Sequence, residues 1–419
     1  MVYLTRFIGD REMQVLEHIK ILDLTTFPTG SLAVMFLVDM GADAIKIEQP
    51  QHRVKIEEAE TDRKAISEVE EEKQREIAAA YQFDERGKRS ICLNLKTQKG
   101  KNIFYQLAKT ADVVIDEFRP GVTERLGVDY NTLKMINPRI ICCSVTGYGH
   151  DGPYRLYPGH DTNFISIAGI LGITGTPDGS HAIPGIPIGD LAGGGMQAAI
   201  GILMALIARE KTGKGQFVDT SMVDALVLFM MIRHGPQFFT NGREPQLGER
   251  PALVFETQDG KYVNIAPGEP WFWERLCKAL SLEEFIPYQR AVGVYAPDTQ
   301  EMLEKRQEIL ISFQEVFRTK TRDEWLRILW EADTCVGPVY KFDEIISDPH
   351  LIHRRMITEI DHPTLGKIKQ PGITINLSET PGRIKGPSPL SGQHTEEILK
   401  SLDYDEKDIA EMREEGVIN

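Results

Sequence analysis

The first fifty residues contain the pattern that most restricts the fold of this chain. Residues 18–24 form a short run rich in β-formers, a turn-like Thr-Thr-Phe-Pro-Thr-Gly segment follows, and residues 31–40 are apolar with helical spacing. Residues 43–48, Asp-Ala-Ile-Lys-Ile-Glu, have the composition of a second strand. A strand, a helix and a strand at this spacing indicate a βαβ unit, which implies a parallel sheet with helices on its faces.

The same alternation continues further along the chain. Residues 90–95 and 113–116 are predicted strands on either side of a helix at 99–110, and residues 140–145 form another apolar strand. The first strand-to-helix turn lacks the GxGxxG fingerprint of ordinary dinucleotide-binding folds, which weakens that reading. We therefore predict an α/β fold with a Rossmann-like parallel sheet and no nicotinamide signature.

The sequence pattern changes near residue 225, and this change predicts a second domain. Residues 255–265 read as a β-hairpin around Asp259-Gly260, and amphipathic helices follow as far as Trp330. We predict a large Rossmann-like domain made of 1–224 with 345–419, and a smaller α+β domain at 225–344. The C-terminal part is expected to return to the first domain or to wrap a partner. The dense charges of 52–76 indicate a solvated helix or a mobile insertion.

Charge and cysteine content exclude several classes of partner. The chain has 62 acidic and 48 basic residues, a net charge of -14, which would repel nucleic acid and anionic membranes. The five cysteines lack zinc-type spacing and are interpreted as packing residues in a reducing compartment. Because the N-terminus is polar and we find no apolar run of about 18 residues, we expect a cytoplasmic protein without a membrane partner.

Titratable residues in loops rich in Gly and Pro are the candidates for chemistry. His160 and Asp161 are adjacent in one such loop, Asp190 precedes a helix opened by Gly193-Gly194-Gly195, and Glu269 lies in a Pro-Gly-Glu-Pro turn. Loops of this kind present side chains to ligands. Structural roles remain open for each carboxylate: a helix N-cap for Asp190, an Asx turn for Asp161 and a surface turn for Glu269.

Several motifs in a single order extend over nearly the whole chain apart from the charged segment. They resemble the family III CoA-transferases and alpha-methylacyl-CoA racemases, and they are Gly41-Ala-Asp-Ala-Ile-Lys-Ile-Glu48, Arg86-Gly-Lys-Arg-Ser90, Leu93-Asn-Leu-Lys96, Phe118-Arg-Pro-Gly-Val-Thr-Glu-Arg-Leu-Gly127, Gly147-Tyr-Gly149, Gly152-Pro153 and Thr212-Gly-Lys-Gly-Gln216 with Asp219. The resemblance implies an interlocked homodimer, or a heteromer with a homologue. It also implies a CoA thioester as substrate, with no permanently bound cofactor and no metal.

The resemblance offers two reactions for the same aspartate. In the transferases the residue matching Asp190 is the nucleophile that forms a mixed anhydride and then an aspartyl-CoA thioester, whereas in the racemases it belongs to an acid/base pair. The racemases resemble this chain at His160, where the transferases often carry Tyr. The resemblance therefore favours epimerisation of 2-methylacyl-CoA, with His160 supported by Glu269 and facing Asp161 and Asp190. The segment 247–252 offers one glycine where transferases often have a glycine-rich loop, which weakens the alternative of CoA transfer.

A third possibility is a CoA-binding subunit that is inactive without a homologous partner. The presence of all the candidate acid/base residues disfavours it.

Basic residues are expected to meet the phosphates of CoA, because the guanidinium fork matches phosphate oxygens. We expect Arg86, Lys88 and Arg89 near the nucleotide phosphates and, by resemblance, Arg119 and Arg125 near the pantetheine and diphosphate. An ion-pair or capping role for Arg125 stays open. The complete set expected to bind CoA is Arg86, Lys88, Arg89, Phe118, Arg119, Arg125, Gly147, Tyr148 and Gly149.

Overall fold

The computed structural model describes residues 13–50, 68–176, 179–248, 253–292 and 299–419. Contacts divide the chain into two compact units. The first comprises Met1–Gly169, Pro184–Arg233 and His353–Asn419, and the second comprises Ile170–Ile183 and His234–Ile352. The predicted small domain at 225–344 lacks the first of these two segments. The glycine-poor segment at 247–252 and the charged segment at 52–76 lie partly outside the described residues.

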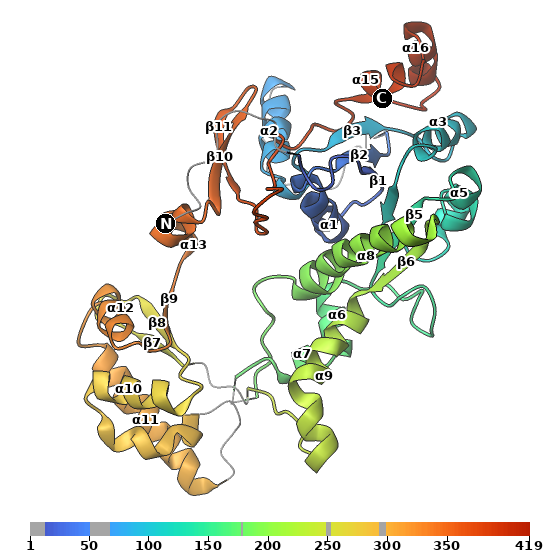
Figure 1. The fold of residues 1–419 in the computed structure, drawn as a ribbon. Helices are drawn as coiled ribbons and strands as arrows, with labels where there is room; N and C mark the ends of the chain where they lie inside the picture. Colours follow the sequence, from blue (N-terminus) through green and yellow to red (C-terminus); the bar gives the residue numbers. More distant parts are fainter. Residues whose placement is uncertain (1–12, 51–67, 177–178, 249–252, 293–298) are drawn as a thin grey trace. The chain divides into compact units, whose positions relative to one another are not determined.

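A six-stranded parallel sheet forms the centre of the first unit, in the order β3-β2-β1-β4-β5-β6 (Figure 1). The strands are β1 (Lys20–Asp23), β2 (Asp43–Glu48), β3 (Arg89–Cys92), β4 (Val113–Asp116), β5 (Ile141–Thr146) and β6 (Phe217–Ser221). The prediction of an α/β fold with a parallel sheet is confirmed. Strand order reverses between β1 and β4, and such a switch point is where open α/β sheets bind ligands.

Helices cover the sheet and complete its core. They are α1 (Pro28–Asp39), α2 (Glu68–Ala80), η1 (Phe83–Glu85), α3 (Gln98–Ala108), α4 (Val122–Leu126), α5 (Tyr130–Ile136), α15 (Thr395–Lys400) and α16 (Glu406–Glu414). Ile398 and Leu399 are fully buried in one cluster with Ile91 and Phe104. The C-terminal residues therefore pack on the first unit. An antiparallel hairpin, β10 (Ile357–His362) with β11 (Gly366–Pro371), precedes them.

A π-helix, η2 (Gly189–Met196), runs directly into α8 (Gln197–Thr212). The chain reaches η2 through α6 (Asp161–Ile167) and α7 (Ile170–Ile173), and continues through β6 to α9 (Met222–Asn241). A Cβ atom on Gly195 would lie 2.6 Å from the backbone oxygen of Thr29. Glycine at this position therefore lets α1 approach the π-helix closely.

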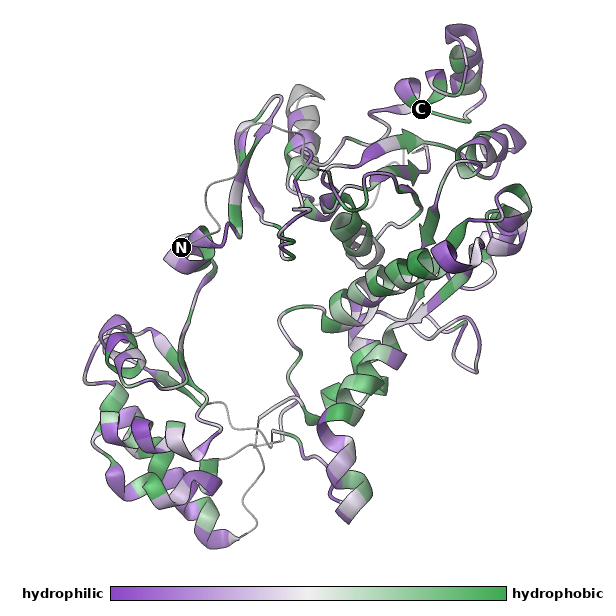
Figure 2. Cartoon of the chain, viewed as in Figure 1, coloured by the Kyte–Doolittle hydropathy of each residue, from purple (hydrophilic) through white to green (hydrophobic). Residues whose placement is uncertain are grey.

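The stretch Gly189–Thr212 corrects one expectation from the sequence. It is long and apolar enough, by length and composition, to cross a membrane, so the chain does contain an apolar run of that size. In the structure 44% of the tested window is buried inside the protein, as expected for a helix that packs one face against a core. Figure 2 shows the hydrophobic residues that continue along α8 and α9.

The second unit has its own antiparallel sheet and its own core. Its strands β7 (Val254–Glu256), β8 (Tyr262–Ile265) and β9 (Val336–Val339) are adjacent in that order, and the β7–β8 pair confirms the predicted hairpin. Trp273, Phe313 and Phe317 are fully buried there. The helical segments are α10 (Pro270–Leu280), η3 (Glu283–Val292), α11 (Gln300–Phe317), α12 (Arg322–Glu331), α13 (Phe342–Ile345) and α14 (Pro349–His353), the last of which reaches the boundary with the first unit.

Candidate active site

Asp161 holds the first turn of the π-helix in place. It is the first residue of α6 and only 8% exposed. Its Oδ1 accepts the backbone N–H of Gly189 at 2.6 Å and that of Asp190 at 3.2 Å. A Cβ atom on Gly189 would lie 2.8 Å from the same oxygen, so a side chain there would crowd this contact. The Asp161 carboxylate therefore fixes the backbone that carries Asp190.

Asp190 and His160 lie within electrostatic range of each other. Burial raises the pKa of Asp190, the Asp161 carboxylate raises it further, and His160 opposes the rise. His160 is the exposed N-cap of α6, and its backbone N–H donates to Oδ1 of Asn163 at 3.0 Å. Both groups belong to the first unit. The structure thus brings together three of the four predicted catalytic residues, one imidazole and two carboxylates.

Glu269 belongs to the second unit, where it is the N-cap of α10. Its carboxylate raises the pKa of Cys335 in that unit, after the larger effect of burial. Its support of His160 therefore stays a prediction from the resemblance.

A cavity of about 1340 Å³ opens at the carboxyl ends of β1 and β2. It is larger than the pockets of roughly 300–1,000 Å³ that hold drug-sized ligands. Phe118, one of the predicted CoA-binding residues, lines it beside the switch point. The remaining lining residues are Leu24, Thr25, Thr26, Lys46, Ile47, Glu48, Gln49, Lys73, Glu76, Ala78, Ala79, Gln82, Glu85, Leu93, Leu95, Leu126, Thr364, Leu365, Pro389, Leu390, Ser391 and Asn419.

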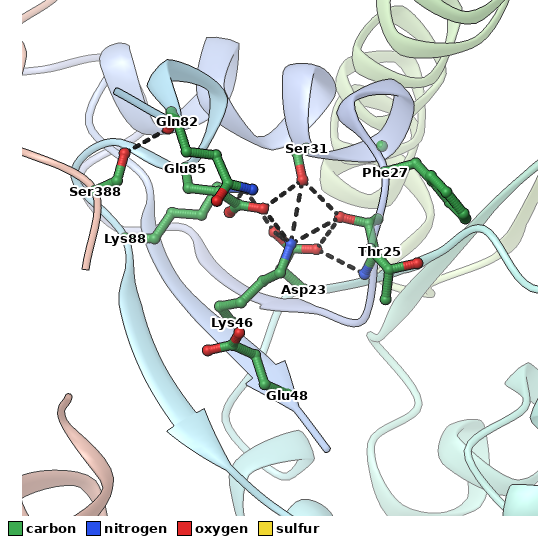
Figure 3. A network of polar contacts seen from close by, with 12 residues as sticks. Asp23, Thr25, Phe27, Ser31, Lys46, Glu48, Gln82, Glu85, Lys88 and Ser388 are labelled. Atoms are coloured by element: carbon green, nitrogen blue, oxygen red, sulfur yellow. Dashed lines mark hydrogen bonds and ion pairs between the residues drawn. The ribbon is translucent and has the colours of Figure 1, made fainter. Parts of the chain in front are cut away.

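Two lysines and two carboxylates form a buried network at this cavity (Figure 3). Lys46 Nζ lies 2.5 Å from Glu85, and Lys88 Nζ lies 2.7 Å from Asp23 and 2.6 Å from Glu85. Burial opposes the charge of Lys46, but Asp23 and Glu85 outweigh it and raise the lysine pKa. Burial likewise works against ionised Asp23, yet Lys46 and Lys88 hold its pKa well below the usual range. Each buried lysine of the network therefore has a carboxylate partner within 2.7 Å.

The predicted phosphate contacts of Arg86 and Lys88 are corrected by this geometry. Arg86 is fully buried, with its guanidinium 2.6 Å from the Asp39 carboxylate, and Lys88 is enclosed in the network above. A cation buried in this way has its charge matched by its partners and cannot turn to a ligand without leaving a carboxylate unpaired. Arg89 is partly exposed and pairs with Asp43 at 2.8 Å. The sequence shows the charge of these residues but gives no sign of partners tens of residues away.

Glu117 occupies the N-terminus of α1, where Rossmann-like folds often bind phosphate. Its carboxylate accepts backbone N–H groups from Thr26, Phe27 and Gly30. Burial raises the pKa of Glu117, and these hydrogen bonds oppose the rise. The N–H groups that could cradle a phosphate are therefore already satisfied, consistent with the absence of GxGxxG from this turn.

Arg119 and Arg125 are exposed. Arg119 directly follows Phe118 in the sequence and Arg125 directly precedes Leu126, and both of these apolar residues line the cavity. They are the predicted cations that remain accessible to a ligand. Within the described ranges, no group of three or more His, Cys, Asp or Glu side chains could hold a metal ion.

The Gly147-Tyr148-Gly149 motif shapes the loop after β5. A Cβ atom on Gly147 would lie 2.2 Å from the Phe164 ring, and Gly149 has a φ of +85° with its N–H donating to Thr146 at 2.8 Å. Both glycines thus meet local steric demands. Tyr148 stands between them with its ring against Phe164.

Comparison with known proteins places this architecture in a family. The model of CoA-transferase family III matches residues 16–395, and the chain belongs to that family. Succinyl-CoA:glutarate CoA-transferase from Homo sapiens is 31% identical over 410 residues, covering 96% of this chain and 90% of the human protein. Alpha-methylacyl-CoA racemase from Homo sapiens is 28% identical over 410 residues, covering 96% and 97%.

The fold also matches solved structures. A CAIB/BAIF family protein from Brucella suis superposes with a TM-score of 0.75 and 27% identity, over 94% of this chain and all of that chain. The protein is therefore an enzyme of a family that includes CoA-transferases and a racemase. The two relatives carry out different reactions, so the family alone does not choose between them.

Proposed function

We propose that this protein epimerises 2-methylacyl-CoA thioesters. The observation that carries the proposal is that the His160 imidazole lies within electrostatic range of the Asp190 carboxylate. His160 is the N-cap of α6, the helix that begins with Asp161, and Asp161 holds the Asp190 backbone. Racemisation beside a thioester carbonyl needs one group to remove the α-proton and another to return a proton from the opposite face. Imidazole is the side chain that ordinarily exchanges protons near neutral pH, and burial and Asp161 raise the pKa of the Asp190 carboxylate, which favours its protonated form.

The reaction is balanced without a co-reactant. One of the pair, His160 or Asp190, takes the proton from the α-carbon, and the electron pair of the C–H bond moves into the thioester to give an enolate. The other group then protonates the α-carbon from the opposite side. Asp161 holds the Asp190 backbone in position through both steps. The two groups exchange roles when the opposite epimer is the substrate.

We propose that the nucleotide part of CoA enters the 1340 Å³ cavity. Arg119 and Arg125 would meet its phosphates, because they are exposed beside lining residues while Arg86 and Lys88 are paired internally. Guanidinium groups suit this task through their paired donors.

Proton exchange in heavy water tests the reaction. We expect deuterium to appear at the α-carbon of a 2-methylacyl-CoA, and His160→Ala or Asp190→Asn to slow this exchange by about 100-fold or more, since each removes one proton carrier. Asp361→Asn, an exposed carboxylate of β10, serves as a matched control and should exchange normally. Absence of exchange with every branched acyl-CoA tried would rule the proposal out.

CoA transfer is the second candidate, and the identity with succinyl-CoA:glutarate CoA-transferase favours it. Asp190 would attack the thioester carbonyl and release CoA thiolate, leaving a mixed anhydride. The thiolate would then attack the aspartyl carbonyl, release the donor acid and form an aspartyl-CoA thioester. Hydroxylamine should then inactivate enzyme preincubated with acyl-CoA, and His160→Ala should retain much of the activity. These two results together would replace epimerisation by transfer.

We also propose that the protein is a homodimer with interlocked chains, or a heteromer with a homologue. The support is a large apolar surface on α8 and α9 of the first unit. Its exposed residues are Ile200, Leu203, Met204, Ile207, Val227, Leu228, Phe229, Met231 and Ile232, and Met196 at the end of η2 is exposed beside α8. Exposed apolar side chains in this number on two successive helices are typical of an interface.

A further inference from the structure

Four aromatic rings form a continuous row in the first unit. Phe164 and Tyr148 meet edge to face at 5.2 Å, Tyr148 and Tyr154 meet edge to face at 6.0 Å, and Tyr154 stacks on Tyr157 at 5.4 Å. We call these four residues the aromatic row. Such separations lie in the range preferred by interacting rings. The row therefore forms an ordered surface in which the position of each ring is set by the next.

The aromatic row begins at the candidate active site. Phe164 lies one helical turn after His160 on α6, and its backbone N–H donates to the His160 carbonyl oxygen at 3.2 Å. A Cβ atom on Gly159, directly before His160, would lie 2.6 Å from the Phe164 ring and 2.9 Å from the Tyr148 hydroxyl. The loop that presents the imidazole is thus packed against the first two rings.

The far end of the aromatic row is open to solvent. Phe164 is only 5% exposed, whereas Tyr154 is 46% and Tyr157 is 58% exposed. Leu156, between the two outer tyrosines, is 54% exposed. The row therefore passes from a buried ring beside the catalytic loop to an exposed apolar surface, as a subsite for an extended ligand group would.

We propose that the aromatic row binds the acyl group of the CoA thioester and selects acyl groups that carry an aromatic ring. Its continuity with His160 identifies the occupant, because the α-carbon must lie beside this imidazole and the acyl chain must leave from there. An aromatic ring gains edge-to-face and stacking contacts with Tyr154 and Tyr157 that a saturated ring of similar size does not.

This inference rests on the proposed function only for the position of the thioester. Epimerisation and CoA transfer both bring that group to Asp190, so either reaction is compatible with the subsite. A substrate such as a short dicarboxylate would leave the outer tyrosines unused.

Binding measured on the full-length protein separates the subsite from the chemistry. Isothermal titration calorimetry with Asp190→Asn would compare 2-methyl-3-phenylpropanoyl-CoA with its 3-cyclohexyl counterpart. We expect the phenyl compound to bind about threefold to tenfold more tightly. Adding Tyr154→Leu and Tyr157→Leu together should bring the two affinities within about twofold, because leucine keeps apolar contact but removes the rings. Tyr262→Leu, an exposed tyrosine of β8, is the matched control and should keep the preference.

Each outcome has one meaning. Equal affinities for the two compounds, or a preference that survives the double substitution, would overturn the subsite. Loss of the preference counts only if circular dichroism shows that the variant is folded, and Tyr157→Phe, which keeps the ring, should retain the preference. Deuterium exchange by the unsubstituted enzyme with 2-methylbutanoyl-CoA tests the proposed reaction separately, since that substrate has no ring.

Discussion

At the scale of single residues, the carboxylate of Asp161 has the clearest role. It accepts the backbone N–H groups of Gly189 and Asp190, which lie 28 and 29 positions later in the sequence. The sequence suggested a local Asx turn as an alternative, because Asp commonly bonds its own following backbone. Instead, the hydrogen bonds from the distant Gly189 and Asp190 backbone hold Asp190 in position. Asp161 is therefore a positioning residue that acts through Asp190. The negative charge of Asp161 also contributes to the raised pKa of Asp190, after burial.

Asp161→Asn separates the positional role from the electrostatic one. The amide oxygen can still accept both N–H groups, but the charge is lost. Because a nearby negative charge disfavours a second one, the pKa of Asp190 should fall, and the acidic limb of the kcat/KM profile should move to lower pH. Asp361→Asn, exposed on β10, should leave the profile in place. A limb that stays fixed or moves to higher pH would show that Asp161 does not act on Asp190 by charge.

At the scale of elements, the π-helix carries Asp190 and packs against α1, and the residues just before α1 line the cavity. Asp190 lies in its first turn, and the glycines at 193–195 face neighbouring elements closely. Thr29 of α1 contacts this glycine surface while Thr25 and Thr26, just before α1, line the cavity. π-helical segments often occur at functional sites. The sequence predicted that Asp190 precedes a helix opened by Gly193-Gly194-Gly195, whereas in the structure Asp190 already lies inside the π-helix. The wider turn packs closely against α1, and periodicity in the sequence gives no sign of it.

Gly195→Ala tests this close packing. In a helix, alanine is more favourable than glycine by about 1 kcal/mol. The added Cβ would, however, lie 2.6 Å from the Thr29 backbone oxygen, which cannot move without shifting α1. Overpacking of this kind costs about 1–3 kcal/mol, so we expect a lower free energy of unfolding in urea and a lower kcat. Gly172→Ala on α7 has nothing within 4 Å of the new Cβ and should be neutral or slightly stabilising. Equal effects of the two substitutions would argue against close packing.

At the scale of the whole molecule, the exposed apolar residues of α8 and α9 support the proposed assembly. Met204 is 66% exposed on α8, and a charge placed there would be buried unpaired if a second subunit covers it. Met204→Glu should therefore convert the assembly to monomers, measured by size-exclusion chromatography with light scattering. Met135→Glu on α5, where the methionine is 80% exposed, should leave the mass unchanged. A monomeric unsubstituted protein would contradict the proposed assembly.

The sequence by itself determined the parallel sheet and the Gly- and Pro-rich segments that lead to His160 and Asp190. Strands buried on both faces appear as continuous apolar runs, and Gly- and Pro-rich loops interrupt them in a readable order. Predicted and observed bounds agree at β2 and β4, where 43–48 and 113–116 were expected. These features are local, because each depends on residues close together in the chain.

Only the tertiary structure decided which charges remain available and what lines the cavity. Arg86 is paired with Asp39, which lies 47 residues earlier in the sequence. Leu24 and Asn419, from opposite ends of the chain, line the same cavity. No pattern in the sequence marks such partners, because a charged side chain looks the same whether it meets water or a buried carboxylate. Burial makes the difference, since an unpaired charge is costly away from solvent and a paired one is no longer free to bind. Those partnerships exist only after the distant segments have folded together.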